Sequence, residues 1–189
     1  MVQSRRVDAL IVAHTLDDDP RLTQLLSCGF PFLALGRSRL PQPYAWFDFD
    51  NYAGTYRATR HLISQGHRRI ALLGENNSQA FITQRRNGYL DALREAGLSD
   101  SWLRSVSPTR RGGYQATLEL LRLPEPPTAI VTDCNTHGDG AAMAPMLYLQ
   151  DKSSDFAESI EEAMPCPLNS GETANRCSTQ TSFVSFQSA

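Results

Sequence analysis

Residues that commonly bind metals or form disulfides are few in this chain. Its four cysteines are Cys28, Cys134, Cys166 and Cys177. No two of them form a CxxC pair, and no cysteine and histidine have the spacing of a zinc site. This pattern is typical of reduced thiols in a cytosolic protein. It predicts no metal site and no cofactor.

Residues that could carry out catalysis lack a supporting pattern as well. Positions 17–19 are all aspartate and could suggest a cation site, but Pro20 follows them and suits the first position of a helix. A solvated loop that ends in a helix cap therefore explains the run better. Gly112 and Gly113 precede a helical pattern without the GxGxxG spacing of a phosphate-binding loop. We also find no Ser/His/Asp arrangement, and we expect a protein that is not an enzyme.

Charge and hydropathy exclude two further classes of partner. The 189 residues have a net charge of −2, which is not the basic surface that nucleic-acid binding requires. The first apolar stretch, from Ala9 to His14, is shorter than the roughly 7–15 apolar residues of a signal peptide. No stretch approaches the roughly 20 apolar residues of a membrane span. We expect a cytoplasmic protein without a membrane partner.

Up to about Ala144 the sequence alternates short β-rich runs with helical patterns. The predicted strands cover 7–12, 30–35, 46–49, 69–74, 103–106 and 129–132, and the predicted helices begin at Pro20 or cover 51–65, 81–96 and 110–121. This alternation predicts an α/β fold with parallel sheets. From Pro145 the chain becomes rich in Ser, Thr, Glu and Gln, and only 154–164 suggests a helix. We expect residues 145–189 to form a disordered tail.

Three segments have an order and spacing that chance would not produce. They are 50–70, with Asp-Asn-x-x-Gly and then Gly-His-Arg-x-Ile; 85–97, with Arg-x-x-Gly-Tyr-x-x-Ala-Leu-x-x-x-Gly; and 113–131, with Gly-Tyr, Leu-Leu and Pro-Thr-Ala-Ile-Val. Together they resemble the LacI/GalR family of transcriptional repressors over residues 5–144. The strand that begins at Val7 is similar to a family strand too.

The resemblance implies a periplasmic-binding-protein-like core, in which two Rossmann-like subdomains with parallel sheets enclose a sugar cleft. The core is incomplete here. By analogy we expect the first crossover between subdomains near Gly66 to Arg69. This places a partial N-terminal subdomain at 1–66, a partial C-terminal subdomain at 67–144, and a non-family tail at 145–189.

The resemblance also implies five effector-binding residues. Arg85 aligns with an arginine that hydrogen-bonds effector hydroxyls, a role that suits the guanidinium fork; the alternative is an exposed helix arginine. Asp50 matches a polar position at the carboxyl end of a strand, where open α/β sheets bind ligands, and equally suits a helix N-cap. Asp133, Cys134 and Asn135 fall where the family commonly has Asn-Asp at a strand tip, and they could instead cap the next helix.

One expected sugar contact is missing from the sequence. The family often has an aromatic residue shortly before Gly113 that stacks on the sugar ring. This chain has Ser107 and Pro108 there. The resemblance therefore leaves the stacking contact unassigned.

The function implied is that of a sugar-responsive transcriptional regulator, with this chain as its effector-binding and dimerisation core. The implied partners are a small-molecule sugar effector and a second copy of the chain. Operator DNA would be bound only through a helix-turn-helix domain, which we do not find before Val7. The alternative is a stand-alone periplasmic-type sugar-binding protein of the same fold. Both the missing export signal and the Gly-His-Arg and Arg-x-x-Gly-Tyr segments argue against that alternative.

Overall fold

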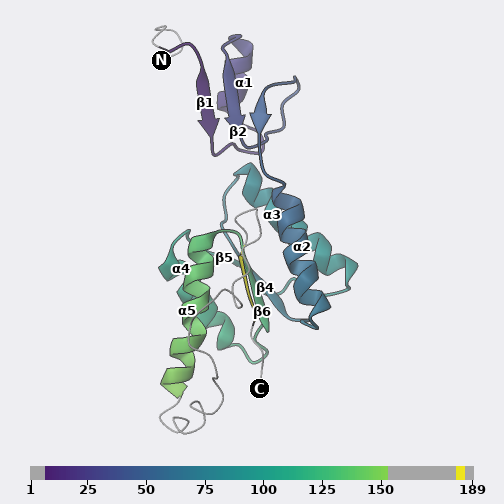
Figure 1. Ribbon diagram of the computed structural model, residues 1–189, viewed down its shortest axis with the longest axis vertical. Coiled ribbons are helices and arrows are strands. Elements are labelled where there is room, and N and C mark those ends of the chain that lie inside the picture. The colour runs from purple at the N-terminus through teal and green to yellow at the C-terminus, as the bar shows by residue number, and fades with distance from the viewer. Residues whose placement is uncertain (1–6, 153–181, 186–189) are drawn as a thin grey trace.

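The computed structural model describes residues 7–152 and 182–185 (Figure 1). Its elements are β1 (Leu10–Ala13), α1 (Pro20–Ser27), β2 (Phe32–Leu35), β3 (Trp46–Phe47), α2 (Asn51–Ser64), β4 (Ile70–Gly74), α3 (Ala80–Glu95), β5 (Leu103–Ser105), α4 (Arg110–Leu121), β6 (Ala129–Thr132), α5 (Asn135–Lys152) and β7 (Ser182–Ser185). Apart from β2 and β3, which follow one another without a helix between them, strands and helices alternate up to α5, and this confirms the predicted α/β class. Two helix starts follow from local chemistry: Asp19 caps α1 ahead of Pro20, and Asp50 caps α2.

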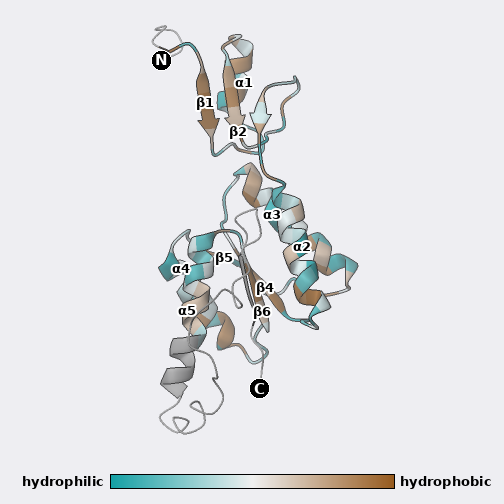
Figure 2. Ribbon diagram, viewed as in Figure 1, coloured by the Kyte–Doolittle hydropathy of each residue, from teal (hydrophilic) through white to brown (hydrophobic). Residues whose placement is uncertain are grey.

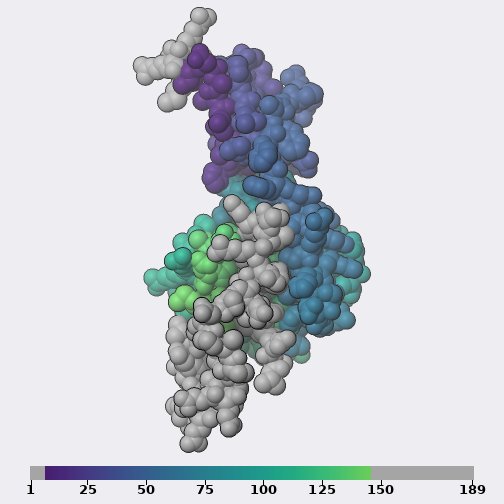
Figure 3. Space-filling model, in the orientation of Figure 1, coloured from purple at the N-terminus to yellow at the C-terminus, as the bar shows by residue number. Residues whose placement is uncertain are grey.

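The strands form two separate sheets. The smaller sheet has the order β1-β2-β3, and all of its strands are parallel. Helix α1 covers one face of it, where Leu22 and Leu25 are buried with Ala34 of β2. This sheet and α1 form a lobe that is set apart from the larger remainder of the molecule (Figure 3).

The larger sheet has the order β5-β4-β6-β7, in which β4 pairs in parallel with both β5 and β6. Helices α2 and α3 pack on one face, where Leu62 and Tyr89 are buried against Leu72. Helices α4 and α5 pack on the other face, where Leu120 is buried against Leu73. Both faces of β4 and β6 are therefore covered, which explains why these strands are apolar over most of their length, with Thr132 the buried polar exception at the end of β6 (Figure 2).

Two of the helix contacts require glycine. A Cβ atom added at Gly88 of α3 would clash with the Tyr52 carbonyl and lie 3.0 Å from the Tyr56 amide nitrogen of α2. A Cβ atom at Gly140 of α5 would lie 2.7 Å from the Tyr114 amide nitrogen of α4. The α2–α3 pair is thus in backbone contact at Gly88. The α4–α5 pair is in backbone contact at Gly140 and also at Gly113, where an added Cβ atom would lie 2.8 Å from the His137 Cα atom.

The position of α2 bears on the subdomain boundary. This helix packs along α3 and contacts β6, so it belongs with the larger sheet (Figure 1). We expected the first crossover near Gly66 to Arg69, at the far end of this helix. The buried face of α2, including Leu62, contributes to the core of the larger sheet.

One helix runs across the break in the sequence pattern that we expected at Ala144. Helix α5 continues to Lys152 with Pro145 inside it, although a proline removes one helical hydrogen bond. Strand β7 then pairs antiparallel with β6 and covers an edge that the parallel strands leave open. The helix predicted over 154–164 lies outside the described residues.

Hydrogen bonds between the loops after β1 and β4 join the two lobes. The Ala80 amide donates to the Thr15 carbonyl (2.8 Å), and the Asp17 amide donates to the Ser78 carbonyl (3.1 Å). The Thr83 hydroxyl donates to the Asp17 carboxylate (2.6 Å). Because these loops follow parallel strands, the carboxyl ends of strands from both sheets lie near this junction.

Candidate functional site

Arg85 lies in α3, two residues after Thr83, whose hydroxyl bonds the smaller lobe, and it is buried, with only 4% of its surface exposed. Its Nε and Nη2 atoms donate to Oδ1 of Asn51 (3.0 and 2.7 Å), and Nη1 donates to the Asp133 carbonyl. The guanidinium also lies over the ring of Phe81, 4.9 Å from its centroid. The structure therefore rules out the alternative that Arg85 is an exposed helix arginine.

The guanidinium of Arg85 has more N–H donors than its hydrogen bonds to Asn51 and Asp133 use. The three bonds above use one N–H on each nitrogen, and each terminal nitrogen carries a second N–H. Burial lowers the pKa of Arg85, while the negative charge of Asp133 opposes this change. An arginine stays cationic in proteins, so this position presents a fixed, charged pair of hydrogen-bond donors.

Asn51 holds Arg85 in place, and sequence reasoning missed it. Its side chain is 1% exposed, and its amide nitrogen donates to Oδ1 of Asp48 (2.9 Å) and to the Phe49 carbonyl (3.0 Å). Those two bonds direct its oxygen toward Arg85. The Asp-Asn motif contains both residues, but only Asp50 was predicted from the sequence as an effector-binding residue.

Asp50 is exposed, and its carboxylate accepts a hydrogen bond from the Ala53 amide (2.9 Å). The structure thus shows it as the N-cap of α2. It also lines a pocket beside the Arg85 network, and the other residues of the pocket are Arg37, Trp46, Asp48, Phe49, Tyr52 and Gln84. We call this the aromatic pocket, because three of its residues present exposed rings. The Arg37 guanidinium lies 5.3 Å from the centre of the Trp46 ring.

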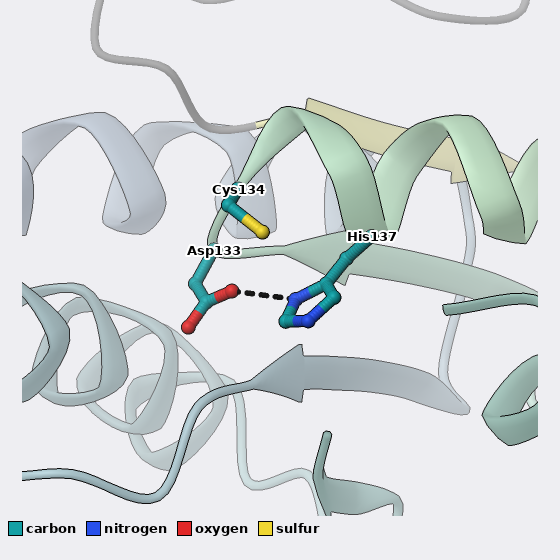
Figure 4. A group of neighbouring side chains, drawn as sticks. All are labelled: Asp133, Cys134 and His137. Atoms are coloured by element: carbon teal, nitrogen blue, oxygen red, sulfur yellow. Dashed lines mark hydrogen bonds and ion pairs between the residues drawn. The ribbon is translucent and has the colours of Figure 1, made fainter. Parts of the chain in front are cut away.

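Asp133 is buried at the end of β6, and partners occupy both of its carboxylate oxygens. Oδ2 accepts from the Glu75 amide (2.7 Å), and Oδ1 lies 2.8 Å from Nδ1 of His137 (Figure 4). The other ring nitrogen of His137 lies 2.7 Å from the Ser107 carbonyl. Asp133 and His137 together therefore link the ends of three neighbouring strands, β4, β5 and β6.

His137 is the second residue that sequence reasoning missed. Although burial lowers the pKa of His137, its hydrogen bonds to Asp133 and Cys134 outweigh burial and raise the pKa to about 10. Burial and the negative charge of Asp133 raise the pKa of Glu75. The tip of β6 therefore contains a buried, charged pair beside Arg85.

Cys134 and Asn135 lie on the outer side of this pair. Cys134 is partly exposed, and its Sγ atom is 3.1 Å from the Thr136 hydroxyl. Asn135 is exposed and opens α5. The structure thus brings Arg85 and Asp133 into direct contact with Cys134 next in the chain, whereas Asp50 lies at the aromatic pocket. Asp48 connects these groups, since it lines the pocket and bonds Asn51.

Comparison with known proteins decides the family. The profile described as periplasmic binding proteins and sugar binding domain of the LacI family matches residues 1–160. The chain belongs to the LacI family. The match confirms the resemblance found in the sequence and the periplasmic-binding-protein-like fold, and it extends beyond the boundary that we expected at Ala144.

The relatives are transcriptional regulators. The chain is 63% identical over 144 residues to the HTH-type transcriptional regulator RafR of Escherichia coli, covering 76% of this chain and 43% of RafR. It is 38% identical over 158 residues to GalR of Escherichia coli K12, covering 82% of this chain and 45% of GalR. The chain therefore spans less than half the length of these curated relatives.

Solved structures agree with this assignment. A regulatory protein of the LacI family from Chloroflexus aggregans has a TM-score of 0.71 at 36% identity, over 78% of this chain and 54% of that one. A LacI family transcriptional regulator from Enterococcus faecium, solved with bound ribose, has a TM-score of 0.64 at 26% identity, over 77% and 55%. Within the described residues, no helix is both long and apolar enough to cross a membrane.

Proposed function

We propose that this chain is the effector-binding core of a sugar-responsive transcriptional regulator. The observation that carries the proposal is the buried guanidinium of Arg85, held by Asn51 and the Asp133 carbonyl where the two lobes meet. A preorganised pair of charged donors suits adjacent hydroxyl oxygens of a sugar. We further propose a subdomain boundary at residues 48–50, so that the sugar binds between lobes.

The aromatic pocket supports a sugar as the effector. Sugar-binding sites combine a few directed polar groups with apolar surface, and the rings of Trp46, Phe49 and Tyr52 offer such surface. Polar groups at the same pocket come from Asp48 and Asp50. These aromatic side chains can supply the stacking contact that Ser107 and Pro108 do not.

The relatives support the remaining parts of the proposal. RafR and GalR are named as HTH-type regulators, so we propose that DNA is bound through a helix-turn-helix domain and that this core has a second copy as its partner. The bound ribose of the Enterococcus faecium regulator favours a sugar over other small molecules. We propose no enzymatic activity. The regulator relatives favour this function over a stand-alone sugar-binding protein.

The experiment compares two neighbouring arginines. Titration calorimetry of the 189-residue chain with a panel of pentoses, hexoses and oligosaccharides first identifies the sugar that binds most tightly. We expect Arg85→Ala to weaken binding of that sugar by roughly 10- to 150-fold, because loss of a charged hydrogen-bonding partner costs on the order of 1.5–3 kcal/mol. Arg86→Ala is the matched control, since Arg86 is exposed on the same helix.

Two results would overturn the proposal. One is that no sugar of the panel binds; the other is that Arg85→Ala, with a native circular dichroism spectrum, binds as tightly as Arg86→Ala. Because Arg85 is buried, Arg85→Lys is measured too. It keeps the charge but loses the planar fork, and we expect it to weaken binding while retaining the fold.

A further inference from the structure

Three different donor atoms meet at the tip of β6. The carboxylate of Asp133, the Sγ atom of Cys134 and a ring nitrogen of His137 all lie within 4.8 Å of one another (Figure 4). They come from the end of one strand and the first turn of α5, so a single local fold positions them. The spacing Asp-Cys-x-x-His is not a recognised zinc motif, and the sequence alone predicted no metal here.

The groups behind these atoms orient them. Nε2 of His137 lies 2.7 Å from the Ser107 carbonyl, which can only accept a hydrogen bond, so Nε2 carries a proton. A backbone carbonyl is the usual outer partner of a metal-binding histidine, because it fixes the ring and the tautomer. The second oxygen of Asp133 is held by the Glu75 amide. The side chains of His137 and Asp133 are therefore oriented by groups outside the site.

A positive charge between the inner atoms can come from a proton or from a metal ion. Nδ1 of His137 lies 2.8 Å from the carboxylate oxygen of Asp133, and without a proton both atoms would present lone pairs to each other. The sulfur of Cys134 adds a third donor on the partly exposed side. A proton on Nδ1 joins the first two atoms only, and the sulfur lies 3.1 Å from the Thr136 hydroxyl, whereas a metal ion can bind all three.

We propose that Asp133, Cys134 and His137 bind a divalent transition metal of the zinc class. Sulfur, imidazole and carboxylate donors favour Zn²⁺ and disfavour Mg²⁺ and Ca²⁺, which prefer oxygen. Three protein ligands leave a fourth position, which is accessible because Cys134 is partly exposed. Binding releases the protons of the thiol and of Nδ1 to solvent.

The geometry sets one requirement on the site. Zn–N and Zn–O bonds of about 2.0–2.2 Å place tetrahedral ligand atoms roughly 3.3–3.6 Å apart. The His137 ring and the Asp133 carboxylate must therefore separate by about 0.5–1 Å to admit the ion. The proposal goes beyond sugar binding and does not depend on it, although the Asp133 carbonyl also accepts a hydrogen bond from Arg85.

The test uses Co²⁺ as a spectroscopic probe, added to the reduced, chelator-treated and untagged 189-residue chain. We expect a thiolate-to-cobalt charge-transfer band that saturates at one ion per chain and disappears when equimolar Zn²⁺ is added. Cys134→Ser should remove the band and weaken Zn²⁺ binding, as measured by calorimetry, by more than about ten-fold. Cys134 is a direct ligand in this proposal, and loss of a residue that only hydrogen-bonds a ligand already lowers metal affinity by about 10- to 100-fold.

A matched variant excludes the other thiols. In the triple variant Cys28→Ser, Cys166→Ser, Cys177→Ser the band should persist with the same stoichiometry. The proposal is overturned if the wild type gives no band, or if the band survives in Cys134→Ser and vanishes in the triple variant. His137→Gln should also lose the band. Because His137 is buried, circular dichroism is used to check that His137→Gln is still folded. Cys134 is partly exposed, so we expect Cys134→Ser to stay folded, and unfolding would then not explain the loss of its cobalt band.

Discussion

The buried network around Arg85 and the aromatic pocket beside it differ in what they already contact. In the network, the polar atoms of Asn51, Arg85 and Asp133 bond one another and the backbone, and each side chain is almost fully buried. In the pocket, Trp46 and Phe49 remain about half exposed, at 45% and 51%. The network is thus fixed by the fold, whereas the pocket leaves apolar surface for another molecule to cover.

This difference in burial predicts that the network mainly affects folding stability and that the aromatic pocket mainly affects ligand binding. A buried polar group costs free energy when its partner is lost, so the network should govern folding as well as affinity. An exposed ring contributes little to folding but gains when a ligand covers it. Substitutions in the two regions should therefore affect different measurements.

The largest effect should follow removal of Asp133. In Asp133→Ala, measured by urea denaturation with a chelator present, the ring of His137 and the Glu75 amide lose their buried partner. We expect a loss of about 3–5 kcal/mol of unfolding free energy. The control is Asp139→Ala, which breaks a partly exposed ion pair with Arg110 and should cost about 0–1 kcal/mol. Equal costs in the two variants would contradict the comparison.

A smaller effect is expected in the aromatic pocket. Trp46→Ala should weaken binding of the sugar by roughly 2- to 12-fold, because aromatic stacking contributes about 0.5–1.5 kcal/mol. Its unfolding free energy should stay within about 0.5 kcal/mol of wild type, as for other exposed positions. Ile11→Ala, which is 69% exposed outside the pocket, is the control for both measurements. If Trp46→Ala lost much stability but bound the sugar as tightly as wild type, the aromatic pocket would contribute to folding and not to binding.

The smallest effect concerns His67, at the opposite end of β4 from the site. Its Nδ1 atom lies 2.9 Å from the Thr128 hydroxyl, and burial lowers its pKa. The folded state thus favours the neutral ring, and this contribution is present above about pH 6.5, the unfolded pKa, and is lost as the pH falls. Wild type should lose more stability than His67→Gln between about pH 7.5 and 5. If the unfolding free energies of wild type and His67→Gln changed with pH in parallel, His67 would not be the source of this pH dependence.

Much of the fold was predictable because its signals are local. The predicted bounds of α4 and β6 match the structure, and Asp19 and Asp50 cap the helices that their positions indicated. Apolar runs and capping residues act over a few positions, so one sequence is sufficient to recognise them. The end of the chain was harder. The change in composition at Pro145 predicted the start of a disordered tail, yet α5 continues past this residue to Lys152.

The site was less predictable because its contacts join distant residues. Arg85 was selected from its motif, but the role of Asn51 depends on a contact across 34 positions. Adjacent residues at a helix start point in different directions, so the Asp-Asn pair alone did not show that Asp50 faces solvent while Asn51 faces inward. His137 was missed since its partner Ser107 follows a different strand.

The glycine contacts at Gly88 and Gly140 bear on how the molecule can move. Because α2 and α3, and likewise α4 and α5, touch backbone to backbone, neither pair can slide without a steric clash. We therefore expect the larger lobe to respond to a ligand as a stiff body, with its internal distances preserved. Adjustment would fall on the hinge-like joint, where Thr15 and Asp17 exchange a small number of hydrogen bonds with residues 78–83. A sensor built from this protein should carry its two reporters on opposite lobes, since reporters within the larger lobe would record no change.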